Sequence, residues 1–86
     1  MTDHAVNSAT GRVLRRHRKA ADLSLRAVAA QGGPSIPFQC DVENGKRGVS
    51  LAVLIRWCKA MGCLAPAVVS EIQFDLEACR DDPIYC

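Results

Sequence analysis

The part of the chain that most limits the fold is residues 24–45, where Gly-Gly-Pro at 32–34 separates two short helical segments. Ser24 can cap the first helix, because its hydroxyl can accept a hydrogen bond from the free N–H groups of the first turn. Glycine tolerates positive φ and proline cannot continue the helical hydrogen-bond ladder, so this helix must end at the tripeptide. Ser35 can cap a second helix directly afterwards. The pattern predicts two short helices joined by a tight turn.

Helical periodicity also dominates the sequence on both sides of this segment. Ser8 or Thr10 can cap a helix that continues to about Ala21, and Ser50 can cap another whose apolar residues recur at three- and four-residue steps. No stretch alternates between apolar and polar residues as a strand does. The expected helices cover about residues 9–21, 25–31, 36–44, 51–61 and 66–78. We predict an all-α, compact five-helix domain with a helix-turn-helix at its second and third helices.

The length of 86 residues is enough for one domain with a modest core. Residues 1–8 are polar and lack periodicity, so we expect a flexible N-terminal arm. The helical domain is expected over residues 9–78. Residues 79–86 follow the last helical pattern and are expected to form a C-terminal tail.

The five cysteines are an odd number without C-x-x-C spacing, and no signal peptide or apolar run of about 18 residues accompanies them. This pattern is typical of a cytoplasmic protein with reduced thiols and no membrane partner. A metal site at Cys58, Cys63, Cys79 and Cys86 is the alternative, but their spacing matches no usual zinc framework. We expect small hydrophobic or unreactive thiols, with no metal and no cofactor.

Basic residues concentrate in the N-terminal two thirds of the chain. Residues 1–60 contain ten Lys/Arg and four Asp/Glu, whereas residues 61–86 contain one Arg and five Asp/Glu. This asymmetry is typical of a protein with one face against a polyanion, although solvated helix faces explain the charge equally well. The two histidines, His4 and His17, form no catalytic pattern with other residues, and His17 fits the inner face of the first helix. We expect no enzymatic activity.

Together these residues resemble the phage repressor and Cro-like helix-turn-helix family, of the xenobiotic-response-element type. The resemblance covers about residues 9–78 and rests on matching spacings of Gly11, Leu14, Arg18, Leu23, Ser24, Val28, Ala29, Gly33, Ser35, Val42, Glu43, Asn44, Gly45, Ser50, Leu51, Leu54, Ala60, Met61 and Gly62. It implies a lambda-repressor-like domain that binds operators in double-stranded DNA, usually as a homodimer. It also implies a structural ion pair in which Arg18 links the first helix to Glu43 at the end of the third.

The resemblance and the chemistry of helix ends together indicate phosphate contacts around the two short helices. A helix N-terminus presents unpaired N–H groups and the positive end of a dipole, so it can hold phosphate oxygens of the DNA backbone. The residues expected to face phosphate are Ser24, Arg26, Ser35, Asn44, Lys46, Arg47 and Ser50. A solvated loop is the alternative for Lys46 and Arg47.

The third helix holds the positions that read base edges in this family, and the residues there are unusual. The outward positions carry Ile36, Pro37, Cys40 and Asp41. Ile36 and Pro37 can contact thymine methyl groups, and Asp41 can accept a hydrogen bond from a cytosine amino group. Gln39 falls where an apolar core residue is usual, so it either bonds a neighbouring helix or reads a base.

The last expected helix has apolar residues on more than one face, so some of them should stay exposed in a monomer and pack against a second copy. The predicted dimer interface consists of Val68, Val69, Ile72, Phe74 and Leu76. The alternative is that the tail over residues 79–86 folds back over them. A two-fold dimer would present two third helices about 34 Å apart to a palindromic operator.

These features predict a sequence-specific DNA-binding transcriptional regulator that represses by occupying its operator as a dimer. Acidic residues between 71 and 77 leave activation open. Specificity can also come from DNA shape, from backbone contacts, or from Arg15, Arg16 and the N-terminal arm. The alternative function is a protein-interaction module, such as an antitoxin-like or phage-encoded adaptor, that uses the apolar start of the third helix to bind a protein partner.

Overall fold

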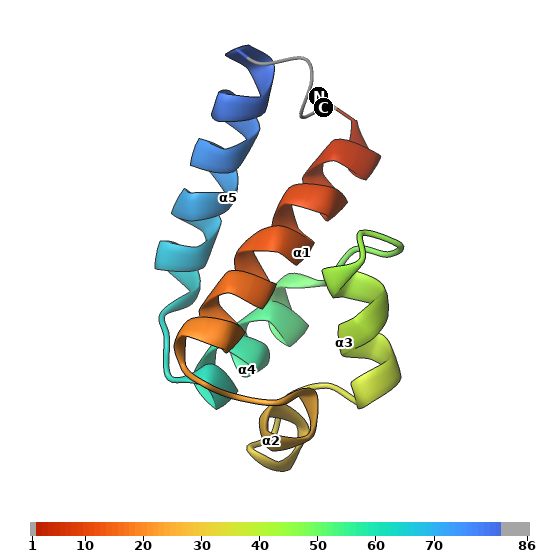
Figure 1. Ribbon diagram of the computed structural model, residues 1–86, viewed down its shortest axis with the longest axis vertical. Helices are drawn as coiled ribbons and strands as arrows, with labels where there is room; N and C mark the ends of the chain where they lie inside the picture. Colours follow the sequence, from red (N-terminus) through yellow and green to blue (C-terminus); the bar gives the residue numbers. More distant parts are fainter. Residues whose placement is uncertain (1, 82–86) are drawn as a thin grey trace.

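The computed structural model describes residues 2–81 of the chain, with side chains up to residue 78. Its five helices are α1 (Asp3–Ala20), α2 (Leu25–Ala30), α3 (Ile36–Glu43), α4 (Leu51–Met61) and α5 (Ala65–Asp81) (Figure 1). None of the described residues is in a strand, so the expected all-α, five-helix fold is confirmed. Within residues 2–81 no single helix is long and apolar enough to span a membrane, and α4 with α5 meets that test only as a pair bent by 108°.

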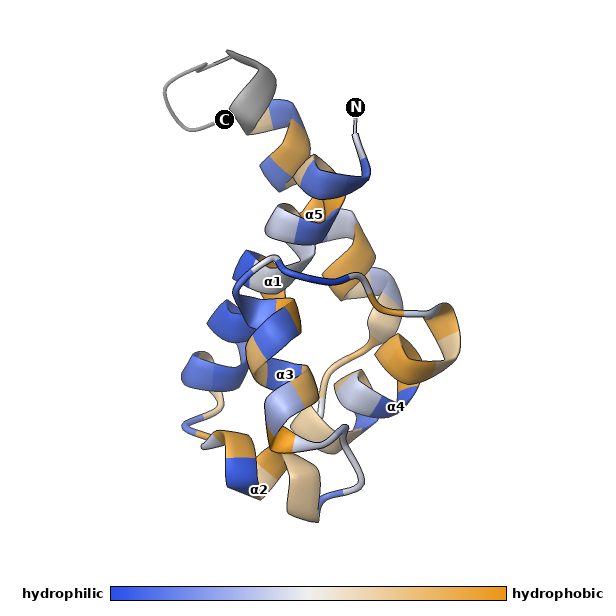
Figure 2. Cartoon of the chain, turned by 90° about the vertical axis from the view of Figure 1, so that its right-hand side faces the viewer, coloured by the Kyte–Doolittle hydropathy of each residue, from blue (hydrophilic) through white to orange (hydrophobic). Residues whose placement is uncertain are grey.

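α1 lies across the middle of the molecule, with α5 packed along one side and α3 along the other (Figure 1). Each helix places at least one fully buried side chain in a single hydrophobic core. These are Leu14 of α1, Val28 of α2, Val42 of α3, Trp57 of α4 and Val68 of α5. α1 is largely hydrophilic over its outer surface, whereas α4 is rich in hydrophobic residues (Figure 2). α4 supplies four of the buried core side chains, Leu54, Trp57, Cys58 and Met61, and the more polar α1 packs closely against both α3 and α5.

Three serines cap helices as the sequence predicts. The hydroxyl of Ser24 accepts a hydrogen bond from the N–H of Ala27 at 3.0 Å, and the hydroxyls of Ser35 and Ser50 accept equivalent bonds at the starts of α3 and α4. Each bond satisfies a donor that the helix itself leaves unpaired. Gly45 has the positive φ of 74° expected after α3. The starts of α2, α3 and α4 are thus set by serine capping bonds, and α3 ends at a glycine with positive φ.

The predicted N-terminal arm differs from the structure, because α1 begins at Asp3 instead of after Ser8 or Thr10. The hydroxyl of Thr2 caps the helix by accepting a hydrogen bond from the N–H of Ala5 at 3.1 Å. Thr10 lies inside the helix, and its hydroxyl donates to the carbonyl of Val6. The prediction of an arm over residues 1–8 is therefore wrong for residues 3–8. Thr2, followed by the acidic residue Asp3 in the first turn, was the signal for this earlier cap.

The boundary of the predicted tail also moves, since α5 continues to Asp81 and includes the first three residues of the range 79–86. Residues 82–86 lie outside the described part of the chain, as does the side chain of Cys79. Cys58 is buried in the core, and this burial, together with the neighbouring thiol of Cys63, raises the pKa of the Cys58 thiol to about 12. Cys58 is therefore a neutral, hydrophobic core residue.

Two glycines allow close approaches that the architecture requires. A Cβ atom at Gly11 would lie 2.3 Å from the carbonyl oxygen of Val42, so α1 can pack against the end of α3 only without a side chain there. A Cβ atom at Gly33 would lie 2.6 Å from a methyl group of Val28. Gly33 therefore lets the turn between α2 and α3 fold back onto α2.

Candidate nucleic-acid interface

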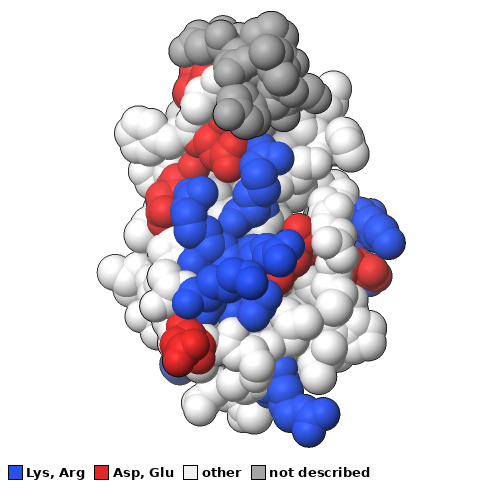
Figure 3. Space-filling view, in the orientation of Figure 1, with Lys and Arg blue, Asp and Glu red and all other residues white. Residues whose placement is uncertain are grey.

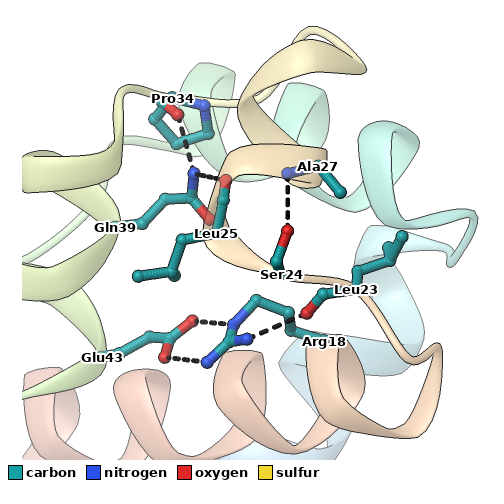
Figure 4. Close-up of polar contacts among 8 residues, drawn as sticks. All are labelled: Arg18, Leu23, Ser24, Leu25, Ala27, Pro34, Gln39 and Glu43. Carbon is teal, nitrogen blue, oxygen red and sulfur yellow. Dashed lines mark hydrogen bonds and ion pairs between the residues drawn. The ribbon is translucent and has the colours of Figure 1, made fainter.

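α2 and α3 are fixed relative to each other by Gln39, which is fully buried between them (Figure 4). Its side-chain amide N–H groups donate to the carbonyl oxygens of Leu25 at 3.0 Å and Pro34 at 2.9 Å. The prediction that Gln39 reads a base is therefore wrong, and the alternative contact with a neighbouring helix is correct. The physical reason is that both carbonyls lie at the inner side of the helix-turn-helix, where only a buried donor can reach them.

The remaining predicted base-facing residues lie on the accessible side of α3. Ile36 and Pro37 are exposed at its first turn, whereas Cys40 and Asp41 are partly buried. Val42 and Gln39 occupy the opposite, buried side. The accessible surface of α3 therefore begins with two apolar side chains and continues to a carboxylate, and its contact with bases stays a prediction.

The end of α3 is tied to α1 by the Arg18–Glu43 contact that the resemblance implied (Figure 4). Arg18 Nε donates to Glu43 Oε2 at 2.8 Å, and the other branch of the guanidinium donates to Glu43 Oε1 at 3.0 Å. A further N–H donates to the carbonyl oxygen of Leu23 at 2.9 Å. The hydrogen bonds that Arg18 donates to Glu43 raise the pKa of Arg18, and both side chains are largely buried. These hydrogen bonds therefore hold α1 against the end of α3 and against the turn that leads into α2.

All residues predicted to face phosphate are exposed in the structure. They are Ser24, Arg26, Ser35, Asn44, Lys46, Arg47 and Ser50. The three serine hydroxyls already accept capping bonds, so their hydroxyl hydrogens remain available as donors. Sequence reasoning missed one feature of this group: the guanidinium of Arg47 stacks on the ring of Phe38, 4.4 Å from its centroid. This cation–π contact holds the α3–α4 loop against α3.

Only some of the residues predicted to form the dimer interface are exposed in the single chain. Val68 and Ile72 are buried in the core of the single chain, so these two cannot contact a second copy as predicted, and Leu76 is partly buried against that core. The reason is that α1 covers this face of α5 along its length. Val69 and Phe74 are the two predicted interface residues that are exposed.

A different apolar surface lies between α4 and α5. Leu51, Ile55, Leu64 and Val69 line an open groove of about 800 Å³. Leu51 is 66% exposed and Leu64 is 75% exposed. The four-residue step from Leu51 to Ile55 was the signal for a second apolar face on α4.

α1 carries most of the basic surface seen in Figure 3. α5 supplies acidic partners for part of it: Arg12 pairs with Asp75 at 2.8 Å and Arg16 pairs with Glu71 at 3.4 Å. His17, on the inner side of α1, also donates a hydrogen bond to Glu71. This bond, followed by the contact with Arg16, lowers the pKa of Glu71. Arg12, Arg16 and His17 thus link α1 to α5.

A five-helix domain whose second and third helices meet at a glycine turn, with one side of the third exposed, has the architecture of helix-turn-helix DNA-binding proteins. Residues 9–71 match the family model described as a helix-turn-helix domain, and the chain belongs to this family. The family and fold are those of a DNA-binding regulator.

Two crystal structures of the clp gene regulator ClgR from Corynebacterium glutamicum are similar to this chain. The first has a TM-score of 0.75 and 27% sequence identity, covering 81% of this chain and 91% of that chain. The second has a TM-score of 0.80 and 26% identity, covering 93% and 87% respectively. No curated protein matches the sequence. Within the described side chains, no three His, Cys, Asp or Glu residues lie together as a metal site would require.

Proposed function

We propose that this protein is a sequence-specific transcriptional regulator of the repressor/Cro-like type, which binds a palindromic operator in double-stranded DNA as a homodimer. The observation that carries the proposal is the helix-turn-helix family match over residues 9–71, combined with an accessible face of α3 surrounded by exposed basic and capping residues. The similarity to ClgR, a gene regulator, supports the same function. Its place of action is then the cytoplasm, where operators are accessible.

In this proposal α3 enters the major groove with its first turn leading. Ile36 and Pro37 contact thymine methyl groups, and Asp41 accepts a hydrogen bond from a cytosine amino group. Lys46 and the exposed serines at the helix starts contact phosphates and fix the orientation of α3. Arg47 is anchored by Phe38, so it presents its charge from a defined position beside α3. The phosphate contacts supply affinity and the α3 contacts supply specificity.

The proposed dimer forms through the groove between α4 and α5, because Leu51, Ile55, Leu64 and Val69 expose apolar surface that a second copy can cover. Two-fold symmetry would place the two α3 helices about 34 Å apart, one turn of DNA. A dimer seated on a promoter in this way excludes other proteins from the same stretch of DNA. Repression by occupancy follows directly from that exclusion.

Selection of bound sites from a random double-stranded DNA library tests the proposal. A palindrome with half-sites one helical turn apart is expected, and Asp41→Asn should change the base preferred at one position of each half-site. Asp22→Asn is the matched control, since Asp22 is an exposed carboxylate at the α1–α2 turn with a φ of 58° that asparagine also tolerates. Failure of the wild-type protein to shift any DNA at low salt would sink the proposal and favour the protein-interaction module.

A further inference from the structure

Two basic residues on α1 have no acidic partner among the described residues. Arg15 and Lys19 are exposed and four positions apart, so they lie on one face of the helix. Their neighbours Arg12, Arg16 and Arg18 are instead paired with Asp75, Glu71 and Glu43. Arg15 and Lys19 therefore face solvent without a carboxylate paired to them among the described residues.

This face of α1 lies between two regions proposed to contact the DNA backbone, the α3–α4 loop and the start of α2. At one end, Gly11 packs against the end of α3, and a Cβ atom at Gly45 in the following loop would lie 3.0 Å from the hydroxyl of Ser8. Arg15 follows Gly11 by one helical turn, on the same side of α1. It therefore lies on α1 between the turn that packs against α3 and Lys19.

At the other end, Lys19 lines the same shallow pocket as Ser24, the residue that caps α2. Asp22 also lines this pocket, so one carboxylate reduces the positive charge at its edge. Arg15 and Lys19 thus lie on α1 between the part of the helix that the α3–α4 loop approaches and the start of α2.

We propose that Arg15 and Lys19 form an additional phosphate-contacting surface, which binds the operator backbone between the contacts made by Ser24 and by the α3–α4 loop. This inference rests on the proposed function of the chain as a DNA-binding regulator. The two side chains supply affinity without sequence information, because a phosphate contact is the same at every base pair. Each contact releases a counterion and so contributes to the salt dependence of binding.

Salt titration of DNA binding tests this surface. Arg15→Gln combined with Lys19→Gln should reduce the slope of log affinity against log salt concentration by roughly two units per subunit, or about four for the proposed dimer, and should weaken operator and random DNA by the same factor. Arg15→Lys combined with Lys19→Arg is the matched control, because it alters the same two exposed positions but keeps both positive charges. The control should leave the slope close to that of the wild type.

Equal slopes for the two double variants would overturn the proposed surface while leaving the proposed function intact. A loss confined to operator DNA would also overturn it, since it would mean that these residues read sequence. If the wild-type protein binds neither DNA at low salt, the proposed function itself fails. Circular dichroism melting checks folding, and if the double variant is unfolded, each single variant should reduce the slope by about one unit per subunit, or about two for the dimer.

Discussion

At the level of single residues, Arg18 does more for the fold than its exposed neighbours on α1. Its guanidinium makes two hydrogen bonds to Glu43 and one to the carbonyl of Leu23, all at 2.8–3.0 Å, in a largely buried position. Removing it leaves the carboxylate of Glu43 buried without a counter-charge. Arg18→Ala should therefore lower the free energy of unfolding by about 3 kcal/mol, measured by urea denaturation.

Arg16→Ala is the comparison for this prediction, because Arg16 is also paired with a glutamate but is 56% exposed. An exposed ion pair contributes less than about 1 kcal/mol, so the loss should be small. Arg18→Lys should recover only part of the stability, since a lysine cannot make the two parallel bonds. Equal small losses for Arg18→Ala and Arg16→Ala would contradict the structural role of the Arg18–Glu43 pair.

Gln39 illustrates why the contacts of single side chains were harder to predict from the sequence than the positions of the helices. The sequence showed that Gln39 occupies a position usually apolar, which left two contacts open. The choice depends on the carbonyls of Leu25 and Pro34, which approach the side chain only after α2 and α3 have packed. The cation–π contact between Arg47 and Phe38 is likewise a product of loop geometry that no spacing indicates.

At the level of helices, the sequence was sufficient to predict a helix boundary where a capping residue and a helix-breaking glycine or proline lie close together. Ser24, Ser35 and Ser50 start their helices as predicted, because capping is decided within one turn of the chain. The start of α1 was misplaced because two later residues, Ser8 and Thr10, are equally good caps by type. The burial of Val68 and Ile72 was missed because it depends on α1 lying along α5.

The contact between α1 and α3 depends on the absence of a side chain at Gly11. Alanine normally favours a helix over glycine by about 1 kcal/mol, which would predict stabilisation by Gly11→Ala. Its Cβ atom, however, would lie 2.3 Å from a backbone oxygen of α3, which cannot move aside as a flexible side chain can. We expect the clash to dominate and to lower stability by at least about 3 kcal/mol in thermal or urea unfolding.

Gly48→Ala serves as the control for Gly11→Ala. The added Cβ atom would lie 2.8 Å from the side-chain amide oxygen of Asn7, whose flexible side chain can rotate away. Its cost should be below about 1 kcal/mol. A stability gain from Gly11→Ala would show that α1 and α3 are not as closely packed as described.

The contact between α1 and α5 should depend on pH through Glu71. The hydrogen bond from His17 and the contact with Arg16 lower the pKa of Glu71 in the folded state. A carboxyl group whose pKa is lower in the folded state than in the unfolded state stabilises the fold at pH values above the unfolded-state pKa. This stabilisation is lost as the pH falls through the folded-state pKa. Wild-type protein should therefore exceed Glu71→Gln in stability at neutral pH, by less than about 1 kcal/mol, and this advantage should disappear below about pH 4.

Thermal melting of both proteins from neutral to acidic pH measures this difference. Asp22→Asn is the control, because Asp22 is exposed and has no ion pair among the described residues. Its stability relative to wild type should change little over the same range. A Glu71→Gln difference that grows as the pH falls would have the wrong sign for this contact.

For the whole molecule, the structure separates two kinds of surface onto different helices. Basic residues gather on α1 and around α3, whereas the exposed apolar residues Leu51, Ile55 and Leu64 lie at the α4–α5 groove. This separation allows the groove to be covered by a second copy while the basic surfaces remain free for DNA. The sequence indicated that apolar residues would be left over, but their location followed only from the packing of α1 against α5.

The groove gives a direct test of the dimer. Ile55→Lys places a charge among Leu51, Leu64 and Val69, so it should shift the protein from dimer to monomer, as measured by light scattering, with little change in the melting of the monomer. Operator affinity should fall, because two half-sites are no longer bound together. Phe74→Lys is the matched control: Phe74 is 73% exposed on α5 but does not line the groove. If Phe74→Lys dissociates the dimer and Ile55→Lys does not, the interface lies on the outer face of α5 instead of in the groove.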